Sequence, residues 1–420
     1  MEYVPRIADG QLTDRLAGLG AVLIEGPKGS GKTTTARQHT GSEVLLEVDL
    51  NAVRAVAVDP RLILDGPVPR LIDEWQREPR VWDAVRRAVD DRWPPGAFIL
   101  TGSAEPNDDT PRHSGAGRFS VMRMRPMTLF EQGYSSGEIS LAALMSGDDP
   151  TGARCGLDLN GYIERILVGG WPQLLGAGSA TATTFVRDYV DTIIEHDIGV
   201  VSGGRRDPRL VRRFLHAYAK LTAHPARLST IVDRARSDAG RAGGATGPTR
   251  GSAGAYLQTL RAMMIVDEVE AWIPSLRSRR RFTSVPKRHL VDPSLAASLM
   301  GCTPARLLGD IRTLESLFES LATRDLRIYA EDQGDHVYHY QEHSGGLGVD
   351  LVVAQPSGGW AGFQVRLGGV LVDEAAASLI RMATTRVAHP PTALGVITAT
   401  EYCYRRLDGI WVIPLGCLGP

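Results

Sequence analysis

The strongest candidates for chemistry lie in the stretch LIEGPKGSGKTTTARQ, residues 23–38. Three of its residues are closely spaced glycines, and glycine in a regular element costs roughly 0.5–1 kcal/mol relative to alanine, so the cluster needs a local reason. The spacing Gly26-x-x-x-x-Gly31-Lys32-Thr33 supplies one, because it matches the phosphate-binding loop, whose backbone N–H groups surround an anion where a helix begins. We therefore expect a nucleotide site made of Gly26, Pro27, Lys28, Gly29, Ser30, Gly31, Lys32, Thr33 and Thr34.

Two adjacent carboxylates, Asp73 and Glu74, follow about forty residues later at the end of an apolar run. A strand that ends in such a pair is typical of a metal-dependent nucleoside triphosphatase. In that role Lys32 contacts the β- and γ-phosphates, Thr33 ligates Mg²⁺, Asp73 holds Mg²⁺ through its water shell, and Glu74 polarises the attacking water. The alternative is that the two acids only cap the start of a helix.

Three further residues are candidates for the same site. Thr101 and Ser103 end the apolar run FILTGSA, and a hydroxyl at the carboxyl end of a strand can sense the γ-phosphate or position water. The alternative is a plain turn. Arg118 in GAGRF could face the γ-phosphate, in cis or from a neighbouring subunit, and the alternative is a solvated surface charge.

The pattern of apolar residues indicates three parts of the chain that must position these groups. From about Gly20 to Met127, short apolar runs alternate with amphipathic segments, which is typical of an α/β domain. We expect four strands there, in AVLIEG, EVLLEVDL, PRLIDEWQ and GAFILTGSA. The pattern is then helical to about Asp292, and the glycine-rich residues 236–255 are expected to form a flexible loop or wing between two helices. A long helix near 314–326 and five strand-like runs predict a second α/β domain. We place the domains at 1–150, 151–300 and 301–420.

Length and composition limit the classes of protein. A chain of 420 residues with 43% hydrophobic residues is expected to form more than one domain. The formal net charge of −1 leaves nucleic-acid binding to local patches. The four cysteines show no C-x-x-C pair, which argues against a zinc site or a disulfide scaffold. The apolar runs are short and the N-terminus has no leader pattern, so we expect a cytoplasmic protein without a membrane span.

The order of several motifs resembles a known family. The succession GPKGSGKTT, LIDEWQ, FILTGSA, GAGRFSVMRMRPMTLFE, GGWPQLL, EHDIG and KRHLVDPSLA is similar to prokaryotic AAA-type ATPases that carry a C-terminal domain of unknown function, DUF4143. The resemblance runs from about residue 18 to the end. It implies a P-loop ATPase core, a helical middle section with winged-helix character, and a C-terminal α/β domain similar to restriction endonucleases.

The C-terminal fold that the resemblance implies contains a second set of candidate residues. Nucleases of this fold use an acid from a helix and then Asp…Glu-x-Lys to hold Mg²⁺ and assist a water. Here Glu319 and Asp350 stand at the acidic positions, but the Glu-x-Lys position reads Gln364-Val365-Arg366. Glutamine is a poorer ligand for Mg²⁺ and arginine stays protonated. We therefore expect a degenerate nuclease site without activity, in which Arg366 pairs with Asp350.

Basic residues cluster twice in the middle part, and they could grip a phosphate backbone. A solvated helix face and a charged turn are the alternative reading of these two clusters. The candidate contacts are Arg205, Arg206, Arg209, Arg212, Arg213, Arg279, Arg280 and Arg281.

These observations predict a Mg²⁺-dependent ATPase that binds ATP, in which nucleotide state is coupled to middle and C-terminal domains that bind DNA or a partner protein. One alternative is a nucleotide-dependent signalling protein that turns over slowly, and another is a nuclease gated by ATP. An oligomer is compatible with Arg118 facing the γ-phosphate of its own subunit or of a neighbouring subunit.

Overall fold

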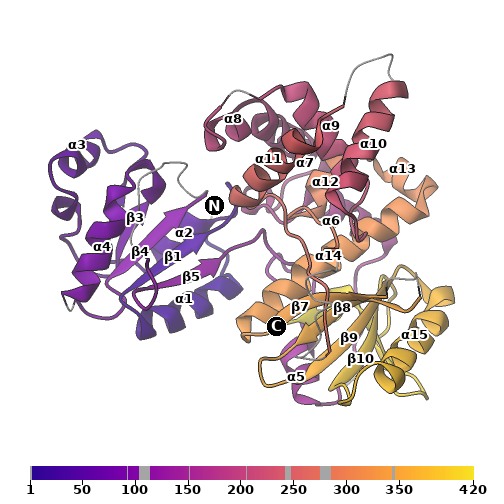
Figure 1. Cartoon of the computed structure of the whole chain (residues 1–420). Coiled ribbons are helices and arrows are strands. Elements are labelled where there is room, and N and C mark those ends of the chain that lie inside the picture. Colours follow the sequence, from indigo (N-terminus) through magenta and orange to yellow (C-terminus); the bar gives the residue numbers. More distant parts are fainter. Residues whose placement is uncertain are drawn as a thin grey trace. The chain divides into compact units, whose positions relative to one another are not determined.

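The computed structural model describes residues 2–91, 93–103, 114–150, 152–204, 206–241, 247–274, 285–342 and 346–420. Residue contacts divide the chain into two compact units. The first contains residues 1–126 together with the short segments 199–205 and 259–265. The second contains the remaining residues, 127–198, 206–258 and 266–420. Each unit has its own sheet (Figure 1).

The first unit contains a five-stranded sheet in the order β2-β3-β4-β1-β5. All neighbouring strands are parallel, so their carboxyl ends lie at one edge of the sheet. The strands are β1 (Ala21–Glu25), β2 (Ser42–Leu45), β3 (Arg70–Asp73), β4 (Phe98–Gly102) and β5 (Phe119–Arg123). The first four match predicted strands, and β5 was missed.

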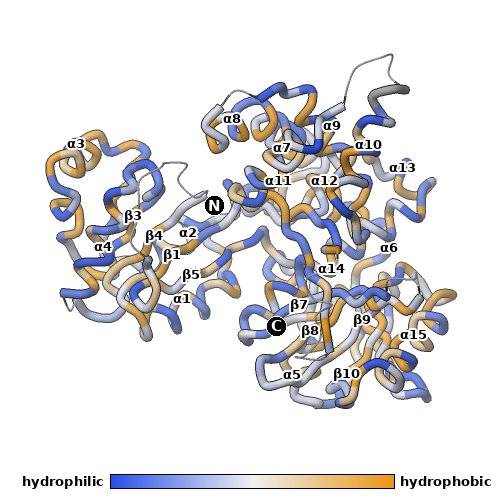
Figure 2. The backbone as a smooth tube through the Cα atoms, viewed as in Figure 1, coloured by the Kyte–Doolittle hydropathy of each residue, from blue (hydrophilic) through white to orange (hydrophobic). Residues whose placement is uncertain are grey.

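Helices cover both faces of this sheet, because each face has an apolar core of its own. The helical elements are α1 (Ile7–Gly18), α2 (Lys32–Gln38), α3 (Leu50–Val58), η1 (Pro60–Ile63), η2 (Trp75–Arg77) and α4 (Arg80–Asp90). Helix α3 is strongly hydrophobic (Figure 2). It buries Ala52 and Val56 but leaves Leu50 and Val58 exposed.

The helical section of the second unit begins after residue 126 and continues into the long helix α14. Its helices are α5 (Leu141–Ser146), α6 (Leu159–Val168), α7 (Ser179–Thr192), α9 (Pro208–Ala219), α10 (Leu228–Arg241), α12 (Pro293–Leu299), α13 (Pro304–Gly309) and α14 (Ile311–Asp332). Short η3 (Pro172–Leu174) and η4 (Ile193–Asp197) also belong to it, whereas α8 (Ile198–Val201) and α11 (Arg250–Ala262) have residues in both units.

The glycine-rich residues 236–255 differ from the prediction. Helix α10 enters this stretch and ends at Arg241, and α11 begins at Arg250, with residues 242–246 outside the described part of the chain. Ala253 is fully buried and Tyr256 nearly so. The burial of this helix face outweighs the cost of about 1 kcal/mol that each helical glycine carries relative to alanine.

A second, six-stranded sheet has the order β11-β12-β10-β9-β8-β7 and mixes parallel with antiparallel pairs. Its strands are β7 (His336–Gln341), β8 (Gly348–Ala354), β9 (Trp360–Arg366), β10 (Ala393–Thr398), β11 (Tyr404–Arg405) and β12 (Trp411–Pro414). The helical elements in this part of the chain are η6 (Gly369–Leu371), α15 (Val372–Thr385) and η7 (Leu415–Cys417). Helices α14 and α15 both contact β8 and β9.

The start of the second unit lies earlier than the predicted boundary at residue 150. Strand β6 (Ile139–Ser140) pairs with β13 (Leu418–Gly419) near the end of the chain. Helix α5 contacts α14 and β9. Residues 127–150 therefore pack with the C-terminal sheet and not with the parallel sheet.

Within the described residues, every helix is too short or too polar to cross a membrane.

Candidate functional site

The glycine-rich loop connects the carboxyl end of β1 to α2. Gly29 and Gly31 have φ angles of 75° and 98°, a conformation that side chains disfavour. A Cβ atom on Gly26 would lie 2.2 Å from the carbonyl oxygen of Met124, so this position has no room for a side chain. The three glycines are therefore required by the shape of the loop. The loop fits a phosphate group, because its backbone amides are not screened by side chains at these positions.

Lys32 lies inside this loop and is 5% exposed. Its Nζ atom donates hydrogen bonds to the carbonyl oxygens of Gly26 (3.0 Å) and Pro27 (2.9 Å). Burial lowers the pKa of Lys32 to about 8, against the opposite effect of the Glu74 and Asp73 carboxylates. A cation that is held by carbonyl groups and poorly hydrated is suited to bind the anionic phosphates of a nucleotide.

Asp73 connects the loop to the neighbouring strands. It ends β3 and is 8% exposed, and its Oδ1 atom accepts a hydrogen bond of 2.7 Å from Thr33 Oγ1. The hydroxyl of Thr101, a fully buried residue of β4, donates to the same oxygen. A threonine hydroxyl and a carboxylate in contact are the pair of oxygen donors that Mg²⁺ takes in P-loop enzymes. Thr101 therefore contacts Asp73, and a sensor role for Thr101 or Ser103 stays a prediction.

Glu74 follows directly, in the left-handed conformation with φ of 55°. The side-chain amide of Gln76 donates to its Oε2 atom, and Ser103 Oγ lies 3.4 Å from the same oxygen. Gln76 Nε2 and Ser103 Oγ are 3.5 Å apart. Gln76 Oε1 is buried and has no hydrogen-bond partner among the described atoms. The carboxylate of Glu74 is thus fixed by two polar side chains, and the sequence analysis singled out only Ser103 of these two.

The structure places Arg118 differently from the prediction. Its backbone carbonyl accepts from the amide of Ala21, at the amino end of β1, whereas the glycine-rich loop follows the carboxyl end. The five residues of β1 span roughly 16 Å. The Arg118 guanidinium instead pairs with Asp90 at 2.8 Å on an exposed surface. Arg118 therefore lies away from the loop of its own subunit in this structure, and a role in a neighbouring subunit stays a prediction.

Arg6 is a loop contact that the sequence analysis missed. It is 7% exposed, and its guanidinium donates to the carbonyl oxygens of Ser30 and Arg125, each at 2.9 Å. Tyr3 Oη lies 3.1 Å from Thr35 Oγ1 on α2. The N-terminal segment therefore braces the loop, and its residues gave no motif signal because both contacts depend on the fold.

The predicted degenerate nuclease residues also come together. Arg366 Nη1 pairs with Asp350 Oδ2 at 2.8 Å, as expected, and Arg366 Nη2 donates to Gln364 Oε1 at 2.8 Å. Gln364 Nε2 donates to the carbonyl oxygen of Gly348 at 2.6 Å. Glu319 on α14 reaches the same cluster, because it shares an ion-pair partner with Asp350.

That shared partner is Lys287, which the sequence analysis did not identify. Its Nζ atom lies 2.6 Å from Glu319 Oε1 and 3.3 Å from Asp350 Oδ1. Burial raises the pKa of Glu319 to about 7, with the Asp350 charge adding to the effect and Lys287 opposing it. Burial also acts to raise the pKa of Asp350, but the charges of Lys287 and Arg366 more than offset it and lower that pKa.

The predicted nucleic-acid contacts are only partly described by the structure. Arg205, Arg279, Arg280 and Arg281 lie outside the described residues. Arg209, Arg212 and Arg213 line one groove of about 880 Å³, as their helical spacing predicted. Acidic residues line the same groove, and Arg212 pairs with Asp191 at 2.8 Å. The groove therefore has a mixed charge. Arg206 lies just before α9 and is not among the residues that line it.

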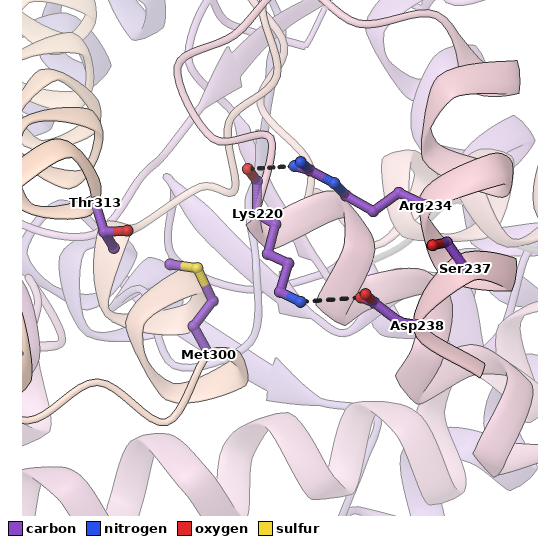
Figure 3. Close-up of a pocket in the computed structure, with 6 residues that line it drawn as sticks. All are labelled: Lys220, Arg234, Ser237, Asp238, Met300 and Thr313. Atoms are coloured by element: carbon purple, nitrogen blue, oxygen red, sulfur yellow. Dashed lines mark hydrogen bonds and ion pairs between the residues drawn. The ribbon is translucent and has the colours of Figure 1, made fainter. Parts of the chain in front are cut away.

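A smaller pocket of about 390 Å³ in the helical section has polar walls (Figure 3). Lys220 Nζ pairs with Asp238 at 3.0 Å, and Arg234 donates to the carbonyl oxygen of Lys220 at 3.1 Å. Both cations therefore have partners in the protein. None of the predicted site residues lines this pocket.

The motif GGWPQLL forms part of a buried polar network. Asp292 accepts from the backbone amide of Gly170 and from Arg324, at 2.9 and 2.8 Å. Arg324 also pairs with Asp325, which accepts from the amide of Leu129 at 2.9 Å. A Cβ atom on Gly170 would lie 2.1 Å from the carbonyl oxygen of Met127. The motif thus has a packing role, and we assign it no chemistry.

Family models match three segments of the chain. Residues 20–132 match an AAA domain, and residues 314–418 match the domain of unknown function DUF4143. Residues 159–306 match another domain of unknown function, DUF8612. The AAA and DUF4143 matches follow each other in the order that the motifs led us to expect, so the resemblance is confirmed.

Two uncharacterized proteins, from Mycobacterium tuberculosis and Mycobacterium bovis, are each 26% identical over 302 residues. The match covers 70% of this chain and 59% of each relative, so the chain spans less than two thirds of their length. Among solved structures, the Walker-type ATPase PABY2304 of Pyrococcus abyssi is 15% identical with a TM-score of 0.41, covering 71% of this chain and 96% of that one. The ORC2 protein of Aeropyrum pernix is 14% identical with a TM-score of 0.31, covering 73% and 93%.

Proposed function

We propose that this protein binds ATP at the loop of residues 26–34 and hydrolyses it to ADP and phosphate with Mg²⁺. The observation that carries the proposal is the contact of Thr33 with Asp73 at 2.7 Å, directly beside a fixed Glu74. One edge of the sheet then holds the anion-binding loop, two oxygen donors for Mg²⁺ (Thr33 and Asp73) and a carboxylate base (Glu74). The AAA-domain match over residues 20–132 supports the same assignment.

Each residue has a distinct role in this proposal. Lys32 and the loop amides bind the β- and γ-phosphates, while Thr33 and Asp73 hold Mg²⁺ directly or through water. When bound, Mg²⁺ neutralises charge that develops on the phosphates. Glu74 accepts a hydrogen bond from the attacking water and polarises it, and Gln76 and Ser103 keep the Glu74 carboxylate in place.

We also propose that nucleotide state is transmitted to the second unit through the chain that follows β5. Met124 lies against Gly26 of the loop, because its carbonyl oxygen occupies the space beside the Gly26 α-carbon. Only three positions later, Met127 is anchored within the second unit by a backbone hydrogen bond of 2.6 Å to Gly170. A change in the loop on nucleotide binding would therefore displace the chain next to Met127, which is buried in the second unit.

The output of this coupling is the binding of DNA or of a protein partner by the middle and C-terminal parts, residues 151–300 and 301–420. The three arginines along α9 support a nucleic-acid partner, whereas the acidic residues in the same groove favour a protein surface of mixed charge. The ion pairs of Arg366 and Lys287 argue against a nuclease.

The experiment is a steady-state ATPase assay of the full chain with Mg²⁺, alone and with duplex DNA, single-stranded DNA or RNA, at two salt concentrations. Lys32→Ala serves as the background control. Activity above this background supports the ATPase, and salt-sensitive stimulation by one nucleic acid identifies the partner class. Equal phosphate release by the Lys32→Ala variant would overturn the assignment. ATP binding with turnover at the background level would favour the slow signalling alternative.

A further inference from the structure

Two carboxylates of the second unit, one buried and one half-buried, lie on opposite sides of one small site. Glu319 comes from α14 and is 8% exposed, and Asp350 comes from β8 with a side chain that is 18% exposed. Oxygen atoms gathered in this way are the usual ligands of a divalent cation. Within the described residues, however, His, Cys, Asp and Glu side chains form no group of three or more that could hold a metal ion.

The position between the two carboxylates is filled by the ammonium group of Lys287. This single group lies within 2.6 Å of Glu319 Oε1 and 3.3 Å of both the Oδ1 atom and the carbonyl oxygen of Asp350. An ammonium group has three donors, so three oxygen contacts satisfy it fully. Lys287 therefore contacts oxygens of the kind that a hard metal ion would require.

The second carboxylate oxygen of Asp350 and the amide oxygen of Gln364 are also engaged. Asp350 Oδ2 accepts from Arg366 Nη1 at 2.8 Å and from the backbone amide of Val365 at 3.0 Å. Gln364 Oε1 accepts from Arg366 Nη2 at 2.8 Å. The site thus combines two carboxylates with two cations, and a divalent ion placed between the carboxylates would meet two positive charges.

Lys287 is also held in place by its backbone. Its amide and carbonyl groups form hydrogen bonds of 2.9 and 3.0 Å with Val269 in an extended pair of segments. The side chain itself is only 6% exposed. The lysine therefore cannot be displaced into solvent by a modest side-chain rotation, as a surface lysine could.

We propose that the ammonium group of Lys287 occupies the cation position of this site, so that the C-terminal domain is closed to divalent metal ions. The lysine is thus a built-in substitute for the metal, supplied by the middle section of the chain. Removing the amino group should open a metal site formed by Glu319 and Asp350. The inference is independent of whether the glycine-rich loop hydrolyses ATP.

The experiment measures Mn²⁺ binding to the nucleotide-free full chain by electron paramagnetic resonance. The wild type and Lys287→Arg should show the same weak binding, and Asp350→Asn should leave the wild-type value unchanged. Lys287→Ala should gain one site that binds Mn²⁺ at least about tenfold more tightly, since one oxygen of Glu319 and one oxygen of Asp350 then lose their ammonium partner. The added site should vanish in the Lys287→Ala, Asp350→Asn double variant. Circular dichroism checks that each variant is folded.

Two results would overturn the proposal. One is a Mn²⁺ site in the wild type that Asp350→Asn removes, because the position would then be open to metal despite Lys287. This measurement needs no substitution at Lys287, so it remains decisive if the alanine variant does not fold. The other is a folded Lys287→Ala protein that binds Mn²⁺ no better than the wild type, because Lys287 would then be a structural ion-pair partner only.

Discussion

The side-chain amide of Gln76 donates a hydrogen bond to the carboxylate of Glu74, two residues earlier in the chain. Glu74 has a left-handed backbone conformation, which is costly for a residue with a side chain and persists only where the surroundings enforce it. Gln76 therefore helps to position Glu74, the proposed base. It is uncharged and lies outside the acidic pair Asp73 and Glu74.

The Gln76→Ala variant tests this positioning role. Without the amide, the Glu74 carboxylate loses a donor, so kcat for ATP should fall about 10-fold or more while KM changes little. Gln76→Glu should be at least as impaired, because a second carboxylate would repel the first. A variant in which KM rises and kcat is preserved would instead assign Gln76 to nucleotide binding.

The roles of Glu74 and Lys32 can be separated by comparing two variants. Glu74→Gln keeps the shape of the site but cannot polarise water, so ATP binding should be retained while turnover falls about 100-fold or more. Lys32→Ala should lose ATP binding as well. Calorimetric binding and single-turnover hydrolysis measure the two effects. Parental turnover in Glu74→Gln would refute the assignment of the base.

The low pKa of Lys32 predicts a pH dependence of ATP binding. Below about pH 8, the free protein already carries the proton on Lys32. Above it the proton is lost, and ATP binding must restore it because the phosphates favour the ammonium form. Affinity should therefore fall as the pH rises from 8 towards the ordinary lysine value of 10.5, by up to about tenfold per pH unit. Calorimetry in buffers of different ionisation enthalpy should detect the proton uptake. A constant affinity over this range would contradict the prediction.

The C-terminal site should be inactive as a nuclease. The full chain is expected to leave supercoiled plasmid and labelled oligonucleotides uncut with Mg²⁺ or Mn²⁺, with and without ATP, because both carboxylates are paired with cations. Cleavage that disappears in Asp350→Ala would overturn this view. Cleavage that persists in that variant comes from another source.

Arg324 should be essential to the stability of the second unit. It is 3% exposed and pairs with Asp292 and Asp325, whose side chains are fully buried. Arg324→Met removes the cation and leaves two buried carboxylates, so the free energy of unfolding should fall by about 3–5 kcal/mol. Denaturant unfolding measures the loss. Arg154→Met is the matched control, since its pair with Glu401 is exposed and should contribute little to stability.

Features that depend on local spacing could be predicted from the sequence. The loop of residues 26–34, the acids at 73 and 74 and four strands of the parallel sheet were all found, since each rests on neighbouring residues. The sequence does not show at which edge of the sheet a residue lies. Arg118 was therefore assigned to the glycine-rich loop, although it lies at the opposite edge of the sheet. Lys287 could not be found in the same way, because its contacts join segments that are 32 and 63 residues away in the chain.

Lys287 comes from residues 151–300, whereas its partners Glu319 and Asp350 come from residues 301–420, so the two segments share one group of charges. A fragment that begins at residue 301 would include Glu319, Asp350 and Arg366 but not the lysine that neutralises the second carboxylate. It would bury an uncompensated negative charge, or take up a proton on Glu319 to avoid it. A division of the chain at residue 300, as predicted from the sequence, would therefore cut through an electrostatic unit, and a replacement of the residues after it must preserve the charge complementarity with Lys287.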